Sequence, residues 1–404
     1  MTVVPDVVIT GLGAISSLGQ DKQAFWSSLA AGRPGIRALS GDFPDTLKVK
    51  IGAQVENFNP KEHFSKAELP LLERHTQFAL IAAREAIADA GLDEQQLSTA
   101  AAVIGTACGG QETNEIGYRQ LFLEGRRRIH PLTIPRAMAS AASSQVSMQL
   151  GIAGPAFTVT SACSSANHAI IQAAMMIRAG LVDVAVAGGA EAPFTYGLLK
   201  AWEALRVLSN DTCRPFSSDR SGLVLGEGAG VVVLESQSHA NARGARILAE
   251  LAGCGMSADA GHVTDPSVDG AMRAMTAALS DAGLEPAAVD YVSAHGTATR
   301  ANDVAETAAL HQLFGEHAQR LAVSSTKSMH GHALGAAGAL ELVATVLAMR
   351  HSLIPPTANF TTPGEGCDLD YVPNTPREMA ISVALSNSFA FGGLNAVLVV
   401  RSVS

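Results

Sequence analysis

Short apolar runs alternate with longer amphipathic stretches along the whole chain. Runs rich in Val, Ile and Ala predict strands, and apolar residues at helical spacing before a glycine predict helices. The predicted strands cover residues 7–10, 101–105, 156–161, 182–188, 228–234, 246–254, 289–294, 321–325, 381–385 and 396–400. The predicted helices cover residues 74–90, 164–179, 270–282 and 337–349. We expect Gly11 and Gly13 to end the first strand.

The order strand, turn, helix recurs in the two halves of the chain, and the last two predicted strands read as an antiparallel pair. The polar stretch 236–245 is the expected junction, which divides the chain into an N-terminal half, 1–245, and a C-terminal half, 246–404. The pattern is typical of an α/β fold. Alternation alone also fits a single doubly wound sheet, so both architectures stay open.

Composition narrows the function class. With 47% hydrophobic and 16% charged residues, the 404-residue chain can bury a large core, which excludes disorder. The net charge of −9, without a long basic run, argues against nucleic acid as the main partner. Five scattered cysteines without a CxxC pair, and an N-terminus without a signal peptide, favour a reduced, cytoplasmic protein.

A stretch without any Asp, Glu, Lys or Arg covers residues 137–177. It is rich in Ser, Ala, Gly, Thr and Gln and is broken by Gly and Pro, so it reads as a buried interior and not as a membrane span. We expect no membrane-spanning segment, and we expect the chemistry to lie near this stretch.

Cys163 ends a predicted strand and opens a predicted helix within the uncharged stretch. The free N–H groups and the dipole of a helix N-terminus favour a thiolate, so Cys163 is a candidate nucleophile. An inert core cysteine is an equally simple interpretation of this residue alone. Cys108 is a weaker candidate, and packing is its expected role.

Two histidines strengthen this interpretation. His295 lies at the end of an apolar strand, and His332 follows another, each beside a glycine that lets backbone approach a ligand. A zinc site involving His330 and His332 is a competing interpretation, but no cysteine or carboxylate with ligand-like spacing lies nearby. We therefore expect no metal. Lys327 and Glu341 are isolated opposite charges in apolar surroundings and are expected to pair.

Four motifs, taken in order, resemble those of the β-ketoacyl-acyl carrier protein synthase II family, condensing enzymes of the thiolase superfamily. They are Thr160-Ser161-Ala162-Cys163-Ser164-Ser165, His295-Gly296-Thr297-Ala298-Thr299, Lys327 with Gly331-His332 and Gly335-Ala336-Ala337-Gly338, and Asn387-Ser388-Phe389-Ala390-Phe391-Gly392-Gly393. The resemblance covers essentially the whole chain. It implies a thiolase-like fold with five layers, αβαβα, built from two pseudo-symmetric βαβαβαββ halves.

The resemblance also implies a reaction, a decarboxylative Claisen condensation in fatty acid elongation. Cys163 would take an acyl chain from acyl carrier protein as a thioester. Malonyl-acyl carrier protein would then lose CO₂, and its carbanion would attack that thioester, which gives a β-ketoacyl chain two carbons longer. No metal or redox cofactor is implied. A homodimer is implied, or a heterodimer with a related subunit.

Roles for further residues follow from the resemblance. His295 and His332 would stabilise the charge that decarboxylation places on the malonyl thioester oxygen. Lys327 would orient the site, held by Glu341. The backbone N–H groups of Cys163 and Phe391 would form the oxyanion hole for condensation, with Phe391 also acting as a gate. The resemblance also implies that the hydroxyls of Thr297 and Thr299 bind the phosphopantetheine arm of the carrier protein.

The acyl pocket departs from the family. Cys108 and Thr133 stand where a large aliphatic and an aromatic side chain are usual, so the pocket is expected to admit medium to long, or rigid unsaturated, chains. Refilling of the space by neighbouring side chains is the alternative. Three arginines match the positions at which the family binds its acidic carrier protein, and an ordinary solvated basic face is the alternative there. They are Arg127, Arg128 and Arg206.

Three other classes of protein fit part of the pattern. A thiolase would carry a second cysteine near the C-terminus, where this chain has Gly392-Gly393. A non-catalytic chain-length subunit would lack the nucleophile, which is present as Cys163. A specialised synthase of a type II polyketide, polyene or nodulation-lipid pathway stays open as the alternative to primary fatty acid synthesis.

Overall fold

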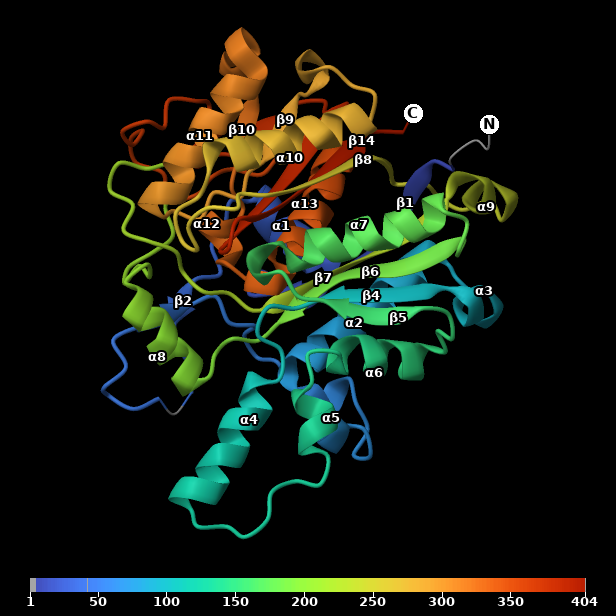
Figure 1. Cartoon of the computed structure of the whole chain (residues 1–404), viewed down its shortest axis with the longest axis vertical. Helices are drawn as coiled ribbons and strands as arrows, with labels where there is room; N and C mark the ends of the chain where they lie inside the picture. The colour runs from blue at the N-terminus through green and yellow to red at the C-terminus, as the bar shows by residue number, and fades with distance from the viewer. Residues whose placement is uncertain (1–4, 42, 404) are drawn as a thin grey trace.

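The computed structural model describes residues 5–41 and 43–403. Ten strands of these residues follow the order β10-β9-β13-β14-β8-β1-β7-β6-β4-β5 (Figure 1). In chain order they are β1 (Val7–Ser16), β4 (Ala101–Gly105), β5 (Ala156–Val159), β6 (Val184–Glu191), β7 (Gly228–Ser236), β8 (Ala249–Ala258), β9 (Tyr291–Ser293), β10 (Ala322–Ser324), β13 (Val383–Ala390) and β14 (Leu394–Arg401). Two small sheets pair β2 (Arg37–Ala38) with β3 (Ile51–Gly52) and β11 (Leu353–Ile354) with β12 (Arg377–Glu378).

The α-helices of the described residues are α1 (Lys22–Ala30), α2 (Arg74–Ala90), α3 (Glu94–Thr99), α4 (Gln111–Tyr118), α5 (Thr133–Ala137), α6 (Ala141–Leu150), α7 (Ser165–Arg178), α8 (Tyr196–Leu205), α9 (Gln237–Ala242), α10 (Val268–Asp281), α11 (Arg300–Phe314), α12 (Lys327–His330) and α13 (Ala337–His351). The four helices predicted from the sequence correspond to α2, α7, α10 and α13. Their boundaries agree with the prediction to within two residues, because the apolar spacing and the glycines that mark these helices are local signals.

The same strand arrangement occurs in both halves of the chain. The order β1-β7-β6-β4-β5 in the first half corresponds to β8-β14-β13-β9-β10 in the second. In each set the first two neighbouring pairs are antiparallel and the last two are parallel. The sets meet at a short antiparallel contact between β1 and β8. The predicted pseudo-symmetric repeat is therefore confirmed, and a single doubly wound parallel sheet is excluded.

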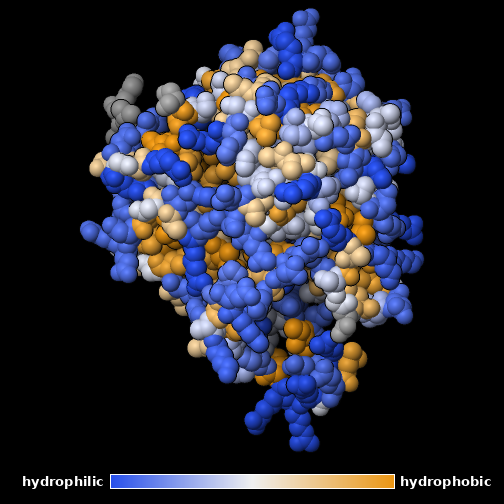
Figure 2. Space-filling view, turned by 180° about the vertical axis from the view of Figure 1, so that it is seen from behind, coloured by the Kyte–Doolittle hydropathy of each residue, from blue (hydrophilic) through white to orange (hydrophobic). Residues whose placement is uncertain are grey.

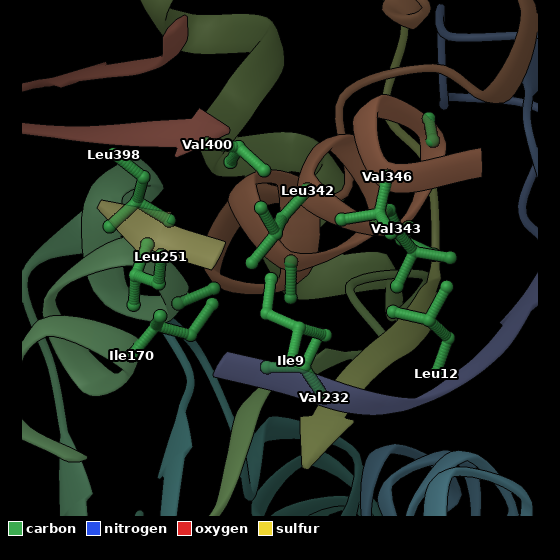
Figure 3. Close-up of a cluster of buried hydrophobic side chains, with 14 of the residues drawn as sticks. Ile9, Leu12, Ile170, Val232, Leu251, Leu342, Val343, Val346, Leu398 and Val400 are labelled. Carbon is green, nitrogen blue, oxygen red and sulfur yellow. The ribbon is translucent and has the colours of Figure 1, made fainter. Parts of the chain in front are cut away.

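Two helices, α7 and α13, lie between the two sets of strands. Figure 3 shows their side chains meeting those of both halves: Ile170 of α7 and Leu342 of α13 lie among Ile9 and Val232 of the first half and Leu398 of the second. On the outer faces, α2 and α6 cover one set and α10 and α11 cover the other. The molecule therefore has the five layers αβαβα of the thiolase-like fold.

The segment Leu334–His351, which includes α13, is long and apolar enough to cross a membrane by length and composition, and 83% of it is buried inside the protein. Its side chains contact both sets of strands in the central layer. The absence of a polar face on this helix therefore follows from burial on all sides.

The first strand is longer than predicted, since β1 continues through Gly11 and Gly13 to Ser16. A Cβ atom at Gly11 would lie 2.1 Å from the carbonyl oxygen of Ala86, and one at Gly13 would lie 2.0 Å from that of Ala82. The glycines therefore let α2 pack directly on the strand, and the prediction that they end it was wrong.

The predicted junction 236–245 contains a short helix, α9, whose N-terminus is capped by the Ser236 hydroxyl. It connects β7 to β8 and thus the two sets of strands. Residues of both halves form one shared core between the sheets. The division of the chain at residue 245 stays a prediction.

A protruding segment between β4 and α6 carries α4, a π-helix (Arg119–Leu123) and α5, at the lower end of Figure 1. Several of its large apolar side chains are exposed. They are Tyr118, Phe122, Leu123 and Ile134. Figure 2 shows orange hydrophobic residues beside blue hydrophilic ones at this end of the molecule.

Candidate active site

Cys163 lies in a tight turn between β5 and α7. The turn is a 3₁₀ segment, Ala162–Ser164, and Ala162 has a left-handed backbone with φ of 51°. The Ser165 hydroxyl donates to the Ala162 carbonyl at 2.6 Å, and that of Thr160 donates to the Thr106 carbonyl at 2.5 Å. These bonds hold Cys163 at the N-terminus of α7, where only 6% of the residue is exposed.

Burial raises the pKa of the Cys163 thiol to about 12. The Lys327 charge and the backbone N–H groups of Phe391 and Cys163 lower this pKa, but they do not outweigh desolvation. Burial therefore opposes the effect that the helix N-terminus is expected to have on this thiol. Cys163 is a thiol surrounded by groups that stabilise negative charge as it develops.

His295 lies in the turn that follows β9, and His332 lies just after α12, the short helix that follows β10. Their ring centroids lie 5.4 Å apart at an interplanar angle of 83°, and both side chains are buried. Burial and the nearby Lys327 charge hold the pKa of both imidazoles well below its usual value. Both rings are therefore neutral near pH 7, and each carries one N–H donor.

Lys327 and Glu341 form an ion pair and are both fully buried. The pairing predicted from their isolation in the sequence is thus confirmed. Burial raises the pKa of Glu341 to about 7, and the Lys327 charge opposes this rise. Removing one partner would leave an uncompensated buried charge, which costs about 3–5 kcal/mol.

Glu306 of α11 fixes the turn that carries His295. Its carboxylate accepts hydrogen bonds from the backbone N–H groups of His295 and Gly296, both at 2.8 Å, and from the Asn387 side chain at 3.1 Å. Sequence reasoning missed Glu306. Two acids spaced three residues apart on one face of a helix, Asp303 and Glu306, are the signal that could have revealed it.

One cavity connects the predicted catalytic residues. Its walls include Cys163, His295, His332 and Phe391, together with two predicted phosphopantetheine-binding residues, Thr297 and Thr299. The two threonine hydroxyls lie 2.9 Å apart. The tertiary structure thus brings together residues that are up to 228 positions apart in the chain.

Phe391 lies in the turn between β13 and β14. Its ring stacks on Trp202 of α8 with a centroid distance of 6.0 Å. The adjacent Gly392 and Gly393 both have left-handed backbones, with φ of 83° and 69°. Trp202, which also lines the cavity, was missed at the sequence level.

The two predicted acyl-pocket residues lie outside the cavity that holds the catalytic residues. Cys108 follows β4 and belongs to the same apolar cluster as Cys163 and Phe391. Thr133 lies at the start of α5, and its hydroxyl donates to the His130 carbonyl at 2.6 Å. Neither residue lines the cavity described above, so the chain by itself does not bring Thr133 to the site.

The three predicted docking arginines are exposed. Arg127 and Arg128 lie on the loop between the π-helix and α5, at the lower end of Figure 1, whereas Arg206 ends α8 at a separate place. Arg126 of the same loop forms an ion pair with Glu124 at 2.8 Å.

A metal site was not expected, and the competing zinc interpretation concerned His330 and His332. Among the residues that the structure describes, no group of three or more His, Cys, Asp or Glu side chains could hold a metal ion. His330 instead lies 2.9 Å from the Thr326 hydroxyl. The expectation that no cofactor is needed stays a prediction.

Two family models match the chain, "Beta-ketoacyl synthase, N-terminal domain" over residues 5–240 and "Beta-ketoacyl synthase, C-terminal domain" over residues 248–361. Nodulation protein E of Rhizobium sp. (strain N33) is 51% identical over 399 residues, which cover 98% of this chain and 99% of that protein. The 3-oxoacyl-[acyl-carrier-protein] synthase 2 of Staphylococcus aureus (strain COL) is 43% identical over 404 residues and 98% of each chain.

Solved structures agree with these relatives. "The ishigamide ketosynthase/chain length factor" superposes with a TM-score of 0.95, 37% identity and full coverage of both chains. A type II polyketide ketosynthase in complex with its acyl carrier protein superposes with a TM-score of 0.91, 34% identity and coverage of 99% of this chain and 100% of that one. On the sequence motifs, the shared thiolase-like fold and these matches, the chain belongs to the β-ketoacyl synthase family of condensing enzymes.

Proposed function

We propose that this protein elongates an acyl chain held on Cys163 by decarboxylative condensation with malonyl-acyl carrier protein. The observation that carries the proposal is the single cavity in which a buried thiol meets two neutral imidazoles. A thiol supplies the acyl acceptor, and two N–H donors supply the charge stabilisation that decarboxylation needs. No redox step occurs in this sequence, so we propose that the protein needs no cofactor.

In the first half-reaction, the Cys163 sulfur attacks the thioester of acyl-acyl carrier protein. The carrier thiol leaves with the proton, and the acyl group remains on Cys163. The N–H groups of Cys163 and Phe391, which lower the pKa of the thiol, stabilise the oxyanion that forms next to it. Lys327 lowers the pKa of the thiol from a distance.

In the second half-reaction, malonyl-acyl carrier protein loses CO₂, and the electron pair passes to the thioester carbonyl. His295 and His332 donate hydrogen bonds to the resulting oxyanion. The carbanion then attacks the acyl carbon, so a C–C bond forms and the bond to Cys163 breaks. The Cys163 thiolate that leaves takes up one proton from water, which returns the thiol. Thr297 and Thr299 hold the phosphopantetheine arm along the cavity.

Mass spectrometry of Cys163 tests the reaction and the chain length together. The protein is incubated with acyl carrier proteins loaded with C4 to C18 chains, saturated and unsaturated, and then digested. We expect an acyl adduct on the peptide that carries Cys163, and a product two carbons longer after malonyl-acyl carrier protein is added. An adduct on another cysteine, or no elongated product with any chain, would refute the proposal.

A specialised pathway is the second candidate. The 51% identity to a nodulation protein E exceeds the 43% identity to a 3-oxoacyl-[acyl-carrier-protein] synthase 2. Cys108 and Thr133 are also smaller than the side chains that the family resemblance implies at these two positions. We propose that the substrates are long or unsaturated chains of a secondary product. A preference for saturated C4–C10 chains in the same assay would favour primary fatty acid synthesis.

We propose that the protein acts as a dimer in the cytoplasm. The strand β5 lies at one end of the strand order, with Phe157 37% exposed, and the protruding segment exposes further apolar side chains. An uncovered sheet edge and a large apolar surface favour association. Sedimentation equilibrium is expected to give twice the chain mass of 41.7 kDa, and a monomer that stays active at micromolar concentration would contradict the dimer.

The proposed cytoplasmic location is supported by the cysteines. All five are free, which is typical of proteins in a reducing compartment.

A further inference from the structure

Glu191 is a fully buried carboxylate at the end of β6, and the mechanism above gives it no role. Its oxygens accept four hydrogen bonds: from the N–H groups of Ala107 (2.7 Å), Cys108 (3.1 Å) and Gly335 (3.1 Å), and from the Thr106 hydroxyl (3.2 Å). Among the described residues, no Lys, Arg or His nitrogen lies within 4 Å of it. Three other fully buried glutamates, Glu227, Glu235 and Glu341, pair with Arg74, Arg243 and Lys327. Glu306, like Glu191, is held by N–H groups without an ion pair.

The two turns that donate hydrogen bonds to Glu191 belong to different halves of the molecule. The turn 106–108 follows β4 of the first half, whereas Gly335 lies three residues after His332 and opens α13 of the second. The two backbones are in direct contact, since a Cβ atom at Gly335 would lie 2.3 Å from the Ala107 nitrogen. Glu191 therefore bonds the two halves to each other where these turns meet.

The turn 106–108 is in turn bonded to the segment that carries the nucleophile. The Thr106 carbonyl accepts hydrogen bonds from Thr160 at 2.5 Å and Ser165 at 3.3 Å, on either side of Cys163. A continuous set of contacts thus leads from Cys163 through Glu191 to the turn after His332.

The pseudo-symmetry provides a second, independent observation. The strands β4 and β9 hold the same place in the two halves. In each half, the second and third residues after the strand donate their N–H groups to one buried carboxylate: Ala107 and Cys108 to Glu191, and His295 and Gly296 to Glu306. Glu306 of α11 fixes the turn that carries His295, and Glu191 of β6 bonds the matching turn of the first half.

We propose that Glu191 is a positioning residue for condensation, whose carboxylate clamps the turn 106–108 against Gly335 and so fixes Cys163 relative to His332. The inference rests on the function proposed above. The charge of Glu191 also faces the thiols of Cys163 and Cys108 and raises the pKa of both, opposite to the effect of Lys327 on Cys163.

The test compares Glu191→Gln, which removes the charge, with Glu191→Asp, which keeps the charge but shortens the reach. For Glu191→Gln we expect kcat of condensation to fall at least tenfold, with KM for malonyl-acyl carrier protein within twofold of wild type. Because a negative charge near the thiol is lost, alkylation of Cys163 by iodoacetamide at pH 8 is expected to accelerate at least threefold. Glu191→Asp is expected to lose at least threefold in kcat without this acceleration.

The matched control is Glu235→Gln, which removes another fully buried carboxylate outside the site, bonded to Thr10 and Arg243. It is expected to lower the melting temperature without changing either readout. A folded Glu191→Gln protein with kcat within twofold of wild type, or with unchanged alkylation, would overturn the inference. If that variant does not fold, Glu191→Asp with wild-type kcat would overturn it. Absence of condensation by the wild-type protein would refute the proposed function instead.

Discussion

Charge and burial oppose each other at the residues of the site. Desolvation keeps Cys163 as a thiol and His295 and His332 as neutral rings, while Lys327 favours negative charge nearby. The thiol and both imidazoles are therefore uncharged at rest, and the site is arranged to stabilise the oxyanions of the reaction.

Replacing the nucleophile should separate the two half-reactions. We expect Cys163→Ala to abolish condensation and to retain or raise decarboxylation of malonyl-acyl carrier protein, because both imidazoles remain. Release of labelled CO₂ and formation of β-ketoacyl product are measured side by side. Full condensation by this variant would exclude Cys163 as the acyl carrier.

The dependence of the decarboxylation rate on pH should show whether the two histidines are neutral. Since the pKa of His295 and His332 lies well below 6.5, both rings stay neutral as the pH falls through 6.5. We expect the decarboxylation rate of Cys163→Ala to show no inflection between pH 7.5 and 6, and to fall only at lower pH. A midpoint near pH 6.5 would mean that the rings are solvated in solution.

At the scale of elements, close packing decides the shape of the fold. The strand β1 carries glycines where α2 approaches its backbone, and the turns before α7 and α13 bring two helix N-termini into the centre. Ala162 and Leu334, at corresponding places in these turns, both have left-handed backbones, with φ of 51° and 45°. The helix N-termini are thereby placed beside the cavity.

A single added methyl group should reveal this packing. We expect Gly13→Ala to destabilise the protein by about 3 kcal/mol, because the new Cβ would overlap the Ala82 carbonyl and backbone must move. Gly261→Ala is the control, since its nearest neighbour would lie at an ordinary 3.9 Å. Urea denaturation gives both values, and equal stability of the two variants would contradict the close contact.

At the scale of the whole molecule, the exposed arginines and the protruding segment point to partners. Arg127 lies on the loop between the π-helix and α5, and Arg206 follows α8, so a carrier protein that touches both would contact two different elements. Thr133 lies on the protruding segment, away from the cavity of its own chain, so its predicted role depends on assembly.

Charge reversal should separate docking from chemistry. We expect Arg127→Glu or Arg206→Glu to weaken association with acyl carrier protein and to flatten its dependence on salt. Turnover of a small acyl-thioester mimic should be unaffected, because both side chains lie outside the cavity. Equal losses with the two substrates would argue against docking at these arginines.

Filling the predicted acyl pocket should shorten the accepted chain. We expect Cys108→Phe combined with Thr133→Phe to lower activity on long-chain acyl carrier proteins at least tenfold, or about 1.4 kcal/mol, while short-chain activity is kept. The single variants show which position contributes, since only Cys108 packs near Cys163 within the chain. An unchanged ratio of long-chain to short-chain activity would mean that other residues limit the pocket.

The sequence by itself determined the helices α2, α7, α10 and α13, the two-fold repeat of the fold, and the pairing of Lys327 with Glu341. These follow from local signals: apolar spacing, terminal glycines and isolated charges that cannot be buried alone. The motifs around Cys163, His295 and His332 also determined the family, because their residue types and order are specific.

Only the tertiary structure decided how these residues act. The path of β1 through its glycines depends on how closely α2 approaches, and the raised pKa of Cys163 depends on its burial. Glu191 was missed because its hydrogen bonds reach residues 83 to 144 positions away. No local pattern encodes such contacts, since they form only when the two halves pack around their common core.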